Sequence, residues 1–137
     1  MATHTFATKS GAIALADLDA ALLEAANGLP YYPLSINTQT STPYVLVLAD
    51  ATPNKIVRMT VAGANQVTLP TTAGAAIPIG SRIPIDQWGG GQTTIAGDGG
   101  VTLRATPTAK TRAQYSRVWV QKIAAEEWLL EGDLASS

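Results

Sequence analysis

The chain has 137 residues, of which 46% are hydrophobic and 14% charged, and its net charge is −1. This length suits one domain with a core of its own, and the low net charge with ample hydrophobic content excludes a disordered chain. Phosphate binding needs an excess of Lys and Arg, so we expect no nucleic-acid partner. The scarcity of charge favours a surface that packs against neighbouring subunits.

The chain contains no cysteine, which excludes disulfides, thiolate metal ligands and cysteine nucleophiles. No segment approaches the roughly 18 consecutive apolar residues of a membrane span. Residues 1–10 also lack the apolar run of a signal peptide. We therefore expect a protein that stays where it is made and has no membrane partner.

The first part of the chain, residues 1–28, is expected to be a polar arm followed by one α-helix. Leu15, Leu18, Leu22 and Leu29 follow a helical spacing and form one apolar stripe between Ile13 and Leu29. Asn27 and Gly28, with a proline at position 30, favour a helix end there. A helix of this length is marginal alone, so the stripe is predicted to dock on a partner.

Residues 29–42 carry two prolines and several Ser and Thr residues, which predicts an extended linker. Residues 43–137 then read as short strands bounded by Gly, Pro or small polar residues. About eight such strands at roughly ten-residue spacing predict a mainly β fold, namely a β-sandwich, a jelly roll or a small barrel. The clearest strand segments are Tyr44–Leu48, Ile56–Met59, Val67–Leu69, Gln92–Ile95, Val101–Ala105, Tyr115–Ile123 and Glu127–Leu130.

Two segments of the β region contain residues that disfavour regular pairing. The isoleucines at 77, 79, 83 and 85 all occupy odd-numbered positions, whereas Pro78 and Pro84 occupy even-numbered positions. Proline has no N–H group to donate to the hydrogen bonds between strands, so this stretch is predicted to be an edge strand or a strand-like loop. Gly89–Gly91 before Gln92-Thr93-Thr94 lacks the Gly-Lys-Ser/Thr end of a phosphate loop, so a hairpin turn is predicted there.

The sequence contains no set of residues that indicates a catalytic site, and we expect no enzyme activity, no cofactor and no metal. His4 is the only histidine and lies in the terminal arm, which offers no rigid support for a catalytic triad. The acidic residues near the C-terminus are predicted to form a solvated hairpin rather than a glycosidase pair. They are Glu126, Glu127, Glu131 and Asp133.

Three tryptophans suggest different roles. Trp119 and Trp128 lie in the last two strand-like segments, where packing in a core or an interface is expected. Trp88 directly precedes the triple glycine, which favours an exposed position in a loop. Trp88 is therefore the aromatic residue that we consider for contact with a partner or ligand.

Two stretches resemble a known module. GQTTIAGDGGVTLRA (Gly91–Ala105) and QYSRVWVQKIAAEEWLLEGDL (Gln114–Leu134) resemble the small β-domain that is widespread in virion proteins of tailed bacteriophages. The upstream segment Lys55–Ile85 fits the same module. The opening Thr5–Ala25 resembles the leader often found ahead of it.

The resemblance implies a non-enzymatic virion component. The preferred interpretation is a capsid decoration (cement) protein, made in the host cytoplasm, that binds the major capsid protein on the outer shell as a homotrimer. The alternative is a short head or tail fibre whose β-domain binds host-surface polysaccharide through Trp88. In the preferred interpretation the residues that contact the capsid or sister subunits are Thr5, Phe6, Ile13, Leu15, Leu18 and Leu22.

Overall fold

The computed structural model describes residues 33–137, and this part of the chain is built almost entirely of strands. The mainly β expectation is confirmed. A short 3-10 helix, η1 (Leu48–Ala51), is the one helix of these residues, and no helix among them is long and apolar enough to cross a membrane. The strands are β1 (Ser35–Gln39), β2 (Tyr44–Val45), β3 (Lys55–Met59), β4 (Asn65–Leu69), β5 (Arg82–Gln87), β6 (Thr93–Gly97), β7 (Thr102–Ala105), β8 (Arg117–Ala124) and β9 (Glu127–Gly132).

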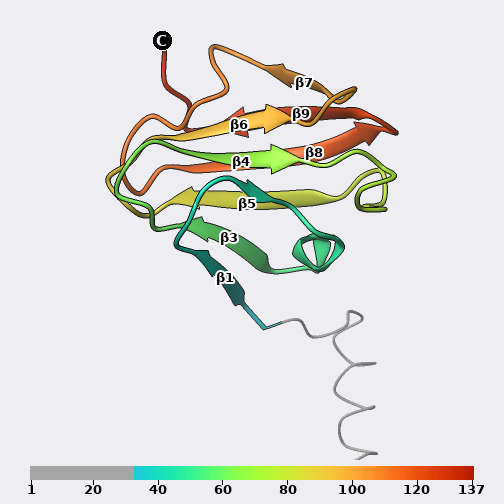
Figure 1. Ribbon diagram of the computed structural model, residues 1–137, viewed down its shortest axis with the longest axis horizontal. Coiled ribbons are helices and arrows are strands. Elements are labelled where there is room, and N and C mark those ends of the chain that lie inside the picture. The colour runs from blue at the N-terminus through green and yellow to red at the C-terminus, as the bar shows by residue number, and fades with distance from the viewer. Residues whose placement is uncertain (1–32) are drawn as a thin grey trace, which may run out of the picture. The chain divides into compact units, whose positions relative to one another are not determined.

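The strands form a β-solenoid of about three coils, so the predicted sandwich, jelly roll or barrel is wrong. β1, β3 and β5 lie parallel in one sheet, called sheet A, and β2, β4 and β6 lie parallel in a second, called sheet B. The chain thus alternates between the two sheets, and each coil contributes one strand to each (Figure 1). The positions of strands in the sequence do not distinguish a solenoid from a sandwich, because both folds are built from similar short strands.

The second and third coils stack without a change of register. Val57 pairs with Ile85 in sheet A, and Asn65 pairs with Thr93 in sheet B. Both pairs are 28 positions apart, so the corner between β3 and β4 lies against the corner between β5 and β6. Gly89–Gly91 belongs to this second corner and joins strands of different sheets. It is therefore not the predicted hairpin turn.

The end of the solenoid beyond the third coil is covered by the C-terminal strands. β8 pairs antiparallel with β5, β9 pairs antiparallel with β8, and β7 pairs parallel with β9. In sheet B, Thr94 of β6 forms a bridge with Lys110. The third coil therefore has partners in both sheets, whereas β1 and β2 of the first coil are, among the described strands, the outermost at the opposite end.

β5 is an internal strand despite Pro84, which corrects the prediction of an edge strand. The amide of Gln87 donates to Ser116 O, so the odd residues of β5 are bonded toward β8 and Pro84 is directed toward β3. The pairing of β3 with β5 begins at Val57 and Ile85, one residue after the proline. The missing N–H therefore falls outside the paired stretch of this ladder.

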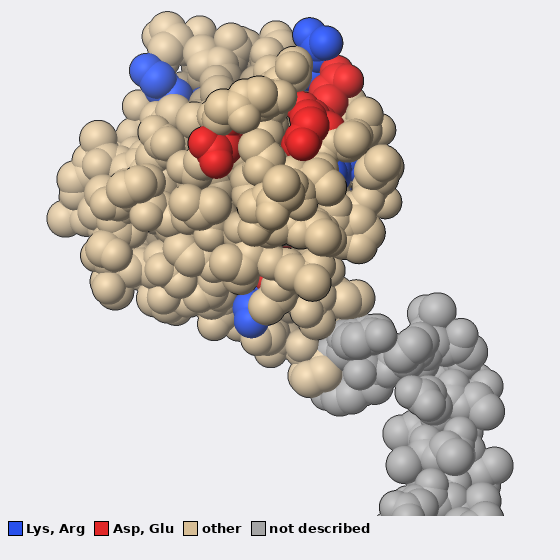
Figure 2. Space-filling view, turned by 45° about the vertical axis from the view of Figure 1, so that its right-hand side comes forward, with Lys and Arg blue, Asp and Glu red and all other residues tan. Residues whose placement is uncertain are grey.

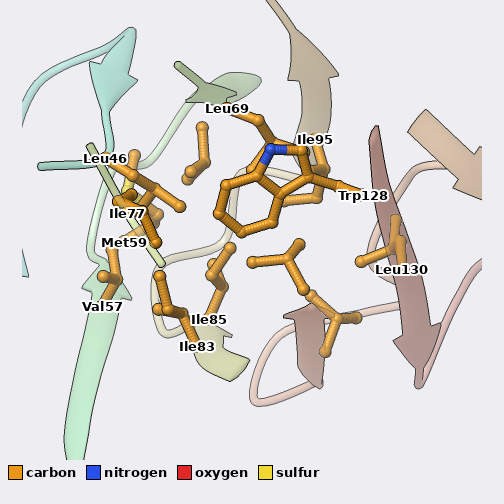
Figure 3. Close-up of a cluster of buried hydrophobic side chains, with 13 residues drawn as sticks. Leu46, Val57, Met59, Leu69, Ile77, Ile83, Ile85, Ile95, Trp128 and Leu130 are labelled. Atoms are coloured by element: carbon orange, nitrogen blue, oxygen red, sulfur yellow. The ribbon is translucent and has the colours of Figure 1, made fainter. Parts of the chain in front are cut away.

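Aliphatic side chains from both sheets fill the interior of the coils around a fully buried Trp128 (Figure 3). The predicted core position of Trp128 is confirmed. Side chains alternate between the two faces of a strand, so each inward position of one coil lies over an inward position of the next. The buried cluster comprises Leu46, Val57, Met59, Val67, Leu69, Ile77, Ile83, Ile85, Ile95, Val118, Val120, Trp128 and Leu130.

A buried polar stack lines the corner beside Gly89–Gly91. Thr93 Oγ1 donates to Asn65 Oδ1 at 2.7 Å, and Asn65 Nδ2 donates to Gly91 O at 3.1 Å. The Thr111 hydroxyl donates to Gln87 Oε1 and accepts from the Thr93 amide, the latter at 3.0 Å. These bonds satisfy polar groups that are removed from water, and they explain the Gly-Gln-Thr-Thr motif as a structural feature.

Candidate functional site

The first coil has an inverted pattern of polar and apolar side chains. Asn37 pairs with Val57 and Tyr44 pairs with Val67, and both partners belong to the buried core. The inward positions of the first coil are thus occupied by polar side chains. The intervening residues Ile36 and Val45 point outward and are exposed.

The inward polar side chains form a network around Asp50, which is buried. Tyr44 Oη donates to Asp50 Oδ2 at 2.7 Å, and Asn37 Nδ2 donates to Asp50 Oδ1 at 2.9 Å. The Val47 amide donates to Asp50 Oδ2 at 3.0 Å, and Gln39 Nε2 donates to Asn37 Oδ1 at 2.7 Å. Burial, followed by the bond to Asp50, raises the pKa of Tyr44 to about 12. The network closes the apolar core at this end with groups whose hydrogen bonds are satisfied.

The first coil also exposes apolar side chains along both sheets, and we call these residues together the first-coil surface. Its side chains are between 41% and 65% exposed and are Leu34, Ile36, Val45, Val47 and Leu48. Asp50 is the one charged residue between positions 34 and 54, and it is buried. On the face seen in Figure 2, most of the charged side chains lie toward the upper end, and one basic side chain lies near the lower end. Exposed large apolar residues in a segment without exposed charge are typical of an interaction surface.

A groove of about 180 Å³ continues the first-coil surface across the outer face of sheet A. Ile36 pairs with Ile56, and Pro84 pairs with Trp119, so apolar side chains follow one another across the strands. The guanidinium of Arg82 lies 4.2 Å from the centre of the Trp119 ring. Trp119 therefore packs on the outer face of the sheet, whereas Trp128 lies in the core. The groove is lined by Leu34, Asn54, Lys55, Ile56, Arg82, Pro84, Arg117 and Trp119.

A second candidate site surrounds Trp88 and rests on a row of charges across sheet A. The buried carboxylate of Asp86 accepts from Arg58 at 3.2 Å and from Arg117 at 2.5 and 2.9 Å. The three residues are in register on neighbouring strands. The hydrogen bonds to Asp86 raise the pKa of Arg117. The two arginines pair with a carboxylate that would be strongly destabilising if it were left buried without a partner.

Trp88 itself is exposed, and its ring already has two neighbours. The Arg58 guanidinium carbon lies 3.7 Å from the ring centre, which is a cation–π contact. Tyr115 packs edge-on with ring centres 5.0 Å apart. Tyr115 is 65% exposed against 41% for Trp88, so it offers more free aromatic surface than the residue singled out from the sequence. The arrangement presents one aromatic pair beside Arg58, which suits a polar ligand with an apolar face.

Comparison with protein-family models, with curated proteins and with solved structures gives no match. Among residues 33–137, no group of three or more His, Asp or Glu side chains is arranged to hold a metal ion. The predicted partner-contacting residues Thr5, Phe6, Ile13, Leu15, Leu18 and Leu22 all lie outside the described residues.

The first-coil surface was not predicted from the sequence. β1 (Ser35–Gln39) falls within residues 29–42, which the prolines and hydroxyl residues indicated as an extended linker. One signal was available, because residues 34–48 contain no charged side chain and place Ile36 between polar neighbours. This signal identifies a surface only when the strand pairing of the coil is known, because the alternation of side chains along each strand then decides which of them point outward.

Proposed function

We propose that this chain is a capsid decoration protein of a tailed bacteriophage, which binds the outer shell as a homotrimer and stabilises it. The observation that carries this proposal is the uncharged, exposed apolar surface of the first coil, which is the outermost coil of residues 33–137 at that end of the solenoid. Terminal coils of repeat proteins need a polar or covered outer face to remain soluble alone. Apolar side chains in this place therefore favour a protein that works in an assembly.

The resemblance of Gly91–Ala105 and Gln114–Leu134 to virion β-domains supplies the kind of assembly. In this proposal the β-solenoid is the rigid knob of each subunit, and residues 1–28 bind the shell. The buried polar stack and the Asp86 charge row support a knob that keeps its shape on an exposed particle surface.

Copy number on the particle tests the proposal. Purified wild-type chain is added to expanded phage shells that lack decoration, and bound protein is quantified against the major capsid protein on a stained gel. We expect saturation at a copy number comparable to that of the capsid protein, together with a higher temperature of shell disruption. Saturation at a few copies per particle, or no binding, would refute decoration.

A second function, a short fibre that binds host-surface polysaccharide, is favoured by the exposed pair of Trp88 and Tyr115. Aromatic faces beside arginines suit sugar rings that carry acidic groups. Under this alternative, Tyr115→Ala abolishes binding to host polysaccharide and leaves the fold intact. Under decoration, the same variant binds shells like the wild type.

A further inference from the structure

The groove on the outer face of sheet A is lined by positive charge. Lys55, Arg82 and Arg117 border it and no carboxylate does, although the whole chain has a net charge of −1. Pro84 and Trp119, which pair across β5 and β8, supply apolar surface beside these cations. A concave site that combines cations with apolar surface suits an anion that also has an apolar face.

Part of this positive charge has no partner among residues 33–137. The Lys55 ammonium forms no ion pair or hydrogen bond with them. Arg117 uses two of its five N–H groups on Asp86, which leaves three for a ligand. Arg58 shares the carboxylate of Asp86, so this row carries one positive charge in excess. Single unpaired charges at two places match the single negative charge of a carboxylate.

Two tryptophans on this face are each in contact with an arginine. The guanidinium carbon of Arg82, which also pairs with a glutamate, lies 4.2 Å from the ring centre of Trp119. That of Arg58 lies 3.7 Å from the ring centre of Trp88. Trp119 pairs with Pro84, and Trp88 follows Pro84 by four positions, so the tryptophans are about 13 Å apart along the strand direction. A ligand that contacts both is therefore a chain of several units.

The place of this face within the sheet favours a carbohydrate over a peptide. β3, β5 and β8 run side by side inside sheet A, with β1 and β7 at its two edges (Figure 1). An extended peptide gains affinity by pairing with a free strand edge, and these internal strands offer none. Aromatic faces instead contact the apolar faces of sugar rings, and a guanidinium binds a carboxylate through two parallel hydrogen bonds.

We propose that the outer face of sheet A binds a linear polysaccharide that carries carboxylates and lies along β5 from Trp119 to Trp88. Its carboxylates bind Lys55 and the remaining N–H groups of Arg117, and its rings lie against the aromatic side chains. The groove of about 180 Å³ is smaller than the roughly 300–1,000 Å³ of a site for a drug-sized ligand, so it takes one ring of the polymer. This binding does not require decoration; it rests on the polysaccharide-binding alternative and adds the groove to the pair of Trp88 and Tyr115.

Binding of polymers of known composition to the full-length chain tests the proposal. Polygalacturonate and hyaluronate are carboxylated polysaccharides, dextran is a neutral one, and poly-glutamate carries carboxylates on a peptide backbone. Lys55→Gln and Arg82→Gln alter the groove, and Arg104→Gln is the matched control. Like Arg82, Arg104 is exposed, belongs to sheet A and pairs with a glutamate, but it lies on β7 and outside the groove. Arg117 is kept because its loss would remove a partner of the buried Asp86.

We expect both carboxylated polysaccharides to bind the wild type and the Arg104→Gln control, with an affinity that falls as salt is added. Lys55→Gln and Arg82→Gln should each weaken binding by roughly tenfold in titration calorimetry, with an unchanged melting temperature. No binding of either polysaccharide, or equally tight binding of dextran or poly-glutamate, would overturn the proposal. A folded groove variant with wild-type affinity, or a control that loses as much affinity as the groove variants, would also overturn it.

Shell binding of the same proteins separates this inference from the proposed functions. A chain that decorates expanded shells but binds neither polysaccharide refutes the inference and leaves decoration standing. A chain that loses polysaccharide binding in Tyr115→Ala, but not in the groove variants, refutes the inference and leaves the fibre alternative standing. A chain that binds through the groove and does not decorate shells refutes decoration alone.

Discussion

Replacement of Gly91 by alanine tests the stacking of the coils directly. A Cβ at position 91 would lie 1.8 Å from Gly63 O and 2.3 Å from Gly63 C, both backbone atoms of the coil below. Real Cβ contacts are essentially never shorter than 3.0 Å. The two corners must therefore move apart, although neighbouring strands of one sheet are held roughly 4.8 Å apart.

The cost follows from the contacts that this movement breaks. The Gly91 amide donates to Val61 O at 3.2 Å and the Trp88 amide donates to Met59 O at 2.8 Å, and we expect these two of the bonds between the corners to be stretched or lost. Two backbone hydrogen bonds at about 1 kcal/mol each, with at least ~1 kcal/mol for overpacking, give a loss of about 3 kcal/mol. For a domain of this size the melting temperature should fall by roughly 12 °C or more.

Gly90 provides the matched control within the same turn. A Cβ at Gly90 meets its nearest atom, Ala62 O, at 4.0 Å, so Gly90→Ala should change stability by less than about 0.5 kcal/mol. Thermal melts followed by circular dichroism measure both variants beside the wild type. If Gly91→Ala melts within ~2 °C of Gly90→Ala, the corners do not stack as described and the coil assignment fails.

Three further predictions concern other parts of the chain. Thr111→Val leaves the buried Thr93 amide without its hydroxyl acceptor and should lower stability by about 1–3 kcal/mol in denaturant melts, and an unchanged midpoint would show that the polar stack is dispensable. Because burial and Asp50 raise the Tyr44 pKa to about 12, its neutral form stabilises the fold fully below pH ~10, and this contribution should fall between pH ~10 and ~12. Tyr44→Phe should remove that part of the pH dependence, so identical profiles for both proteins would contradict the assignment. Leu18→Asp should keep the wild-type melting temperature but leave the shells on mild heating, and a lower melting temperature instead would place the leucine stripe inside the protein.

The strand content and much of the core could be predicted from the sequence, because these depend on local alternation and composition. Runs such as Tyr44–Leu48 and Ile56–Met59 contain strand residues in the structure, and the burial of Trp128 follows from its place in an apolar segment. The exposure of Trp88 likewise agrees with the prediction from the three glycines that follow it in the sequence. Each of these features is set within a window of a few residues.

The choice between sandwich and solenoid depended on which strands pair, and pairing is a property of distant segments. Gly91 appears in the sequence as part of a flexible turn, and only the approach of Gly63, 28 positions earlier, makes a side chain impossible there. Pro84 indicates an edge strand until the register shows that the β3 ladder begins after it.

The first-coil surface was decided by tertiary structure for the same reason. Ile36 and Asn37 differ in polarity, but which of them faces the core depends on the pairing of β1 with β3 and not on either residue. By itself the sequence determined that the chain is rich in short strands and poor in charge. The tertiary structure decided that uncharged apolar side chains are exposed on the first coil of a solenoid, because only long-range pairing brings Ile36 and Val47 to the same coil.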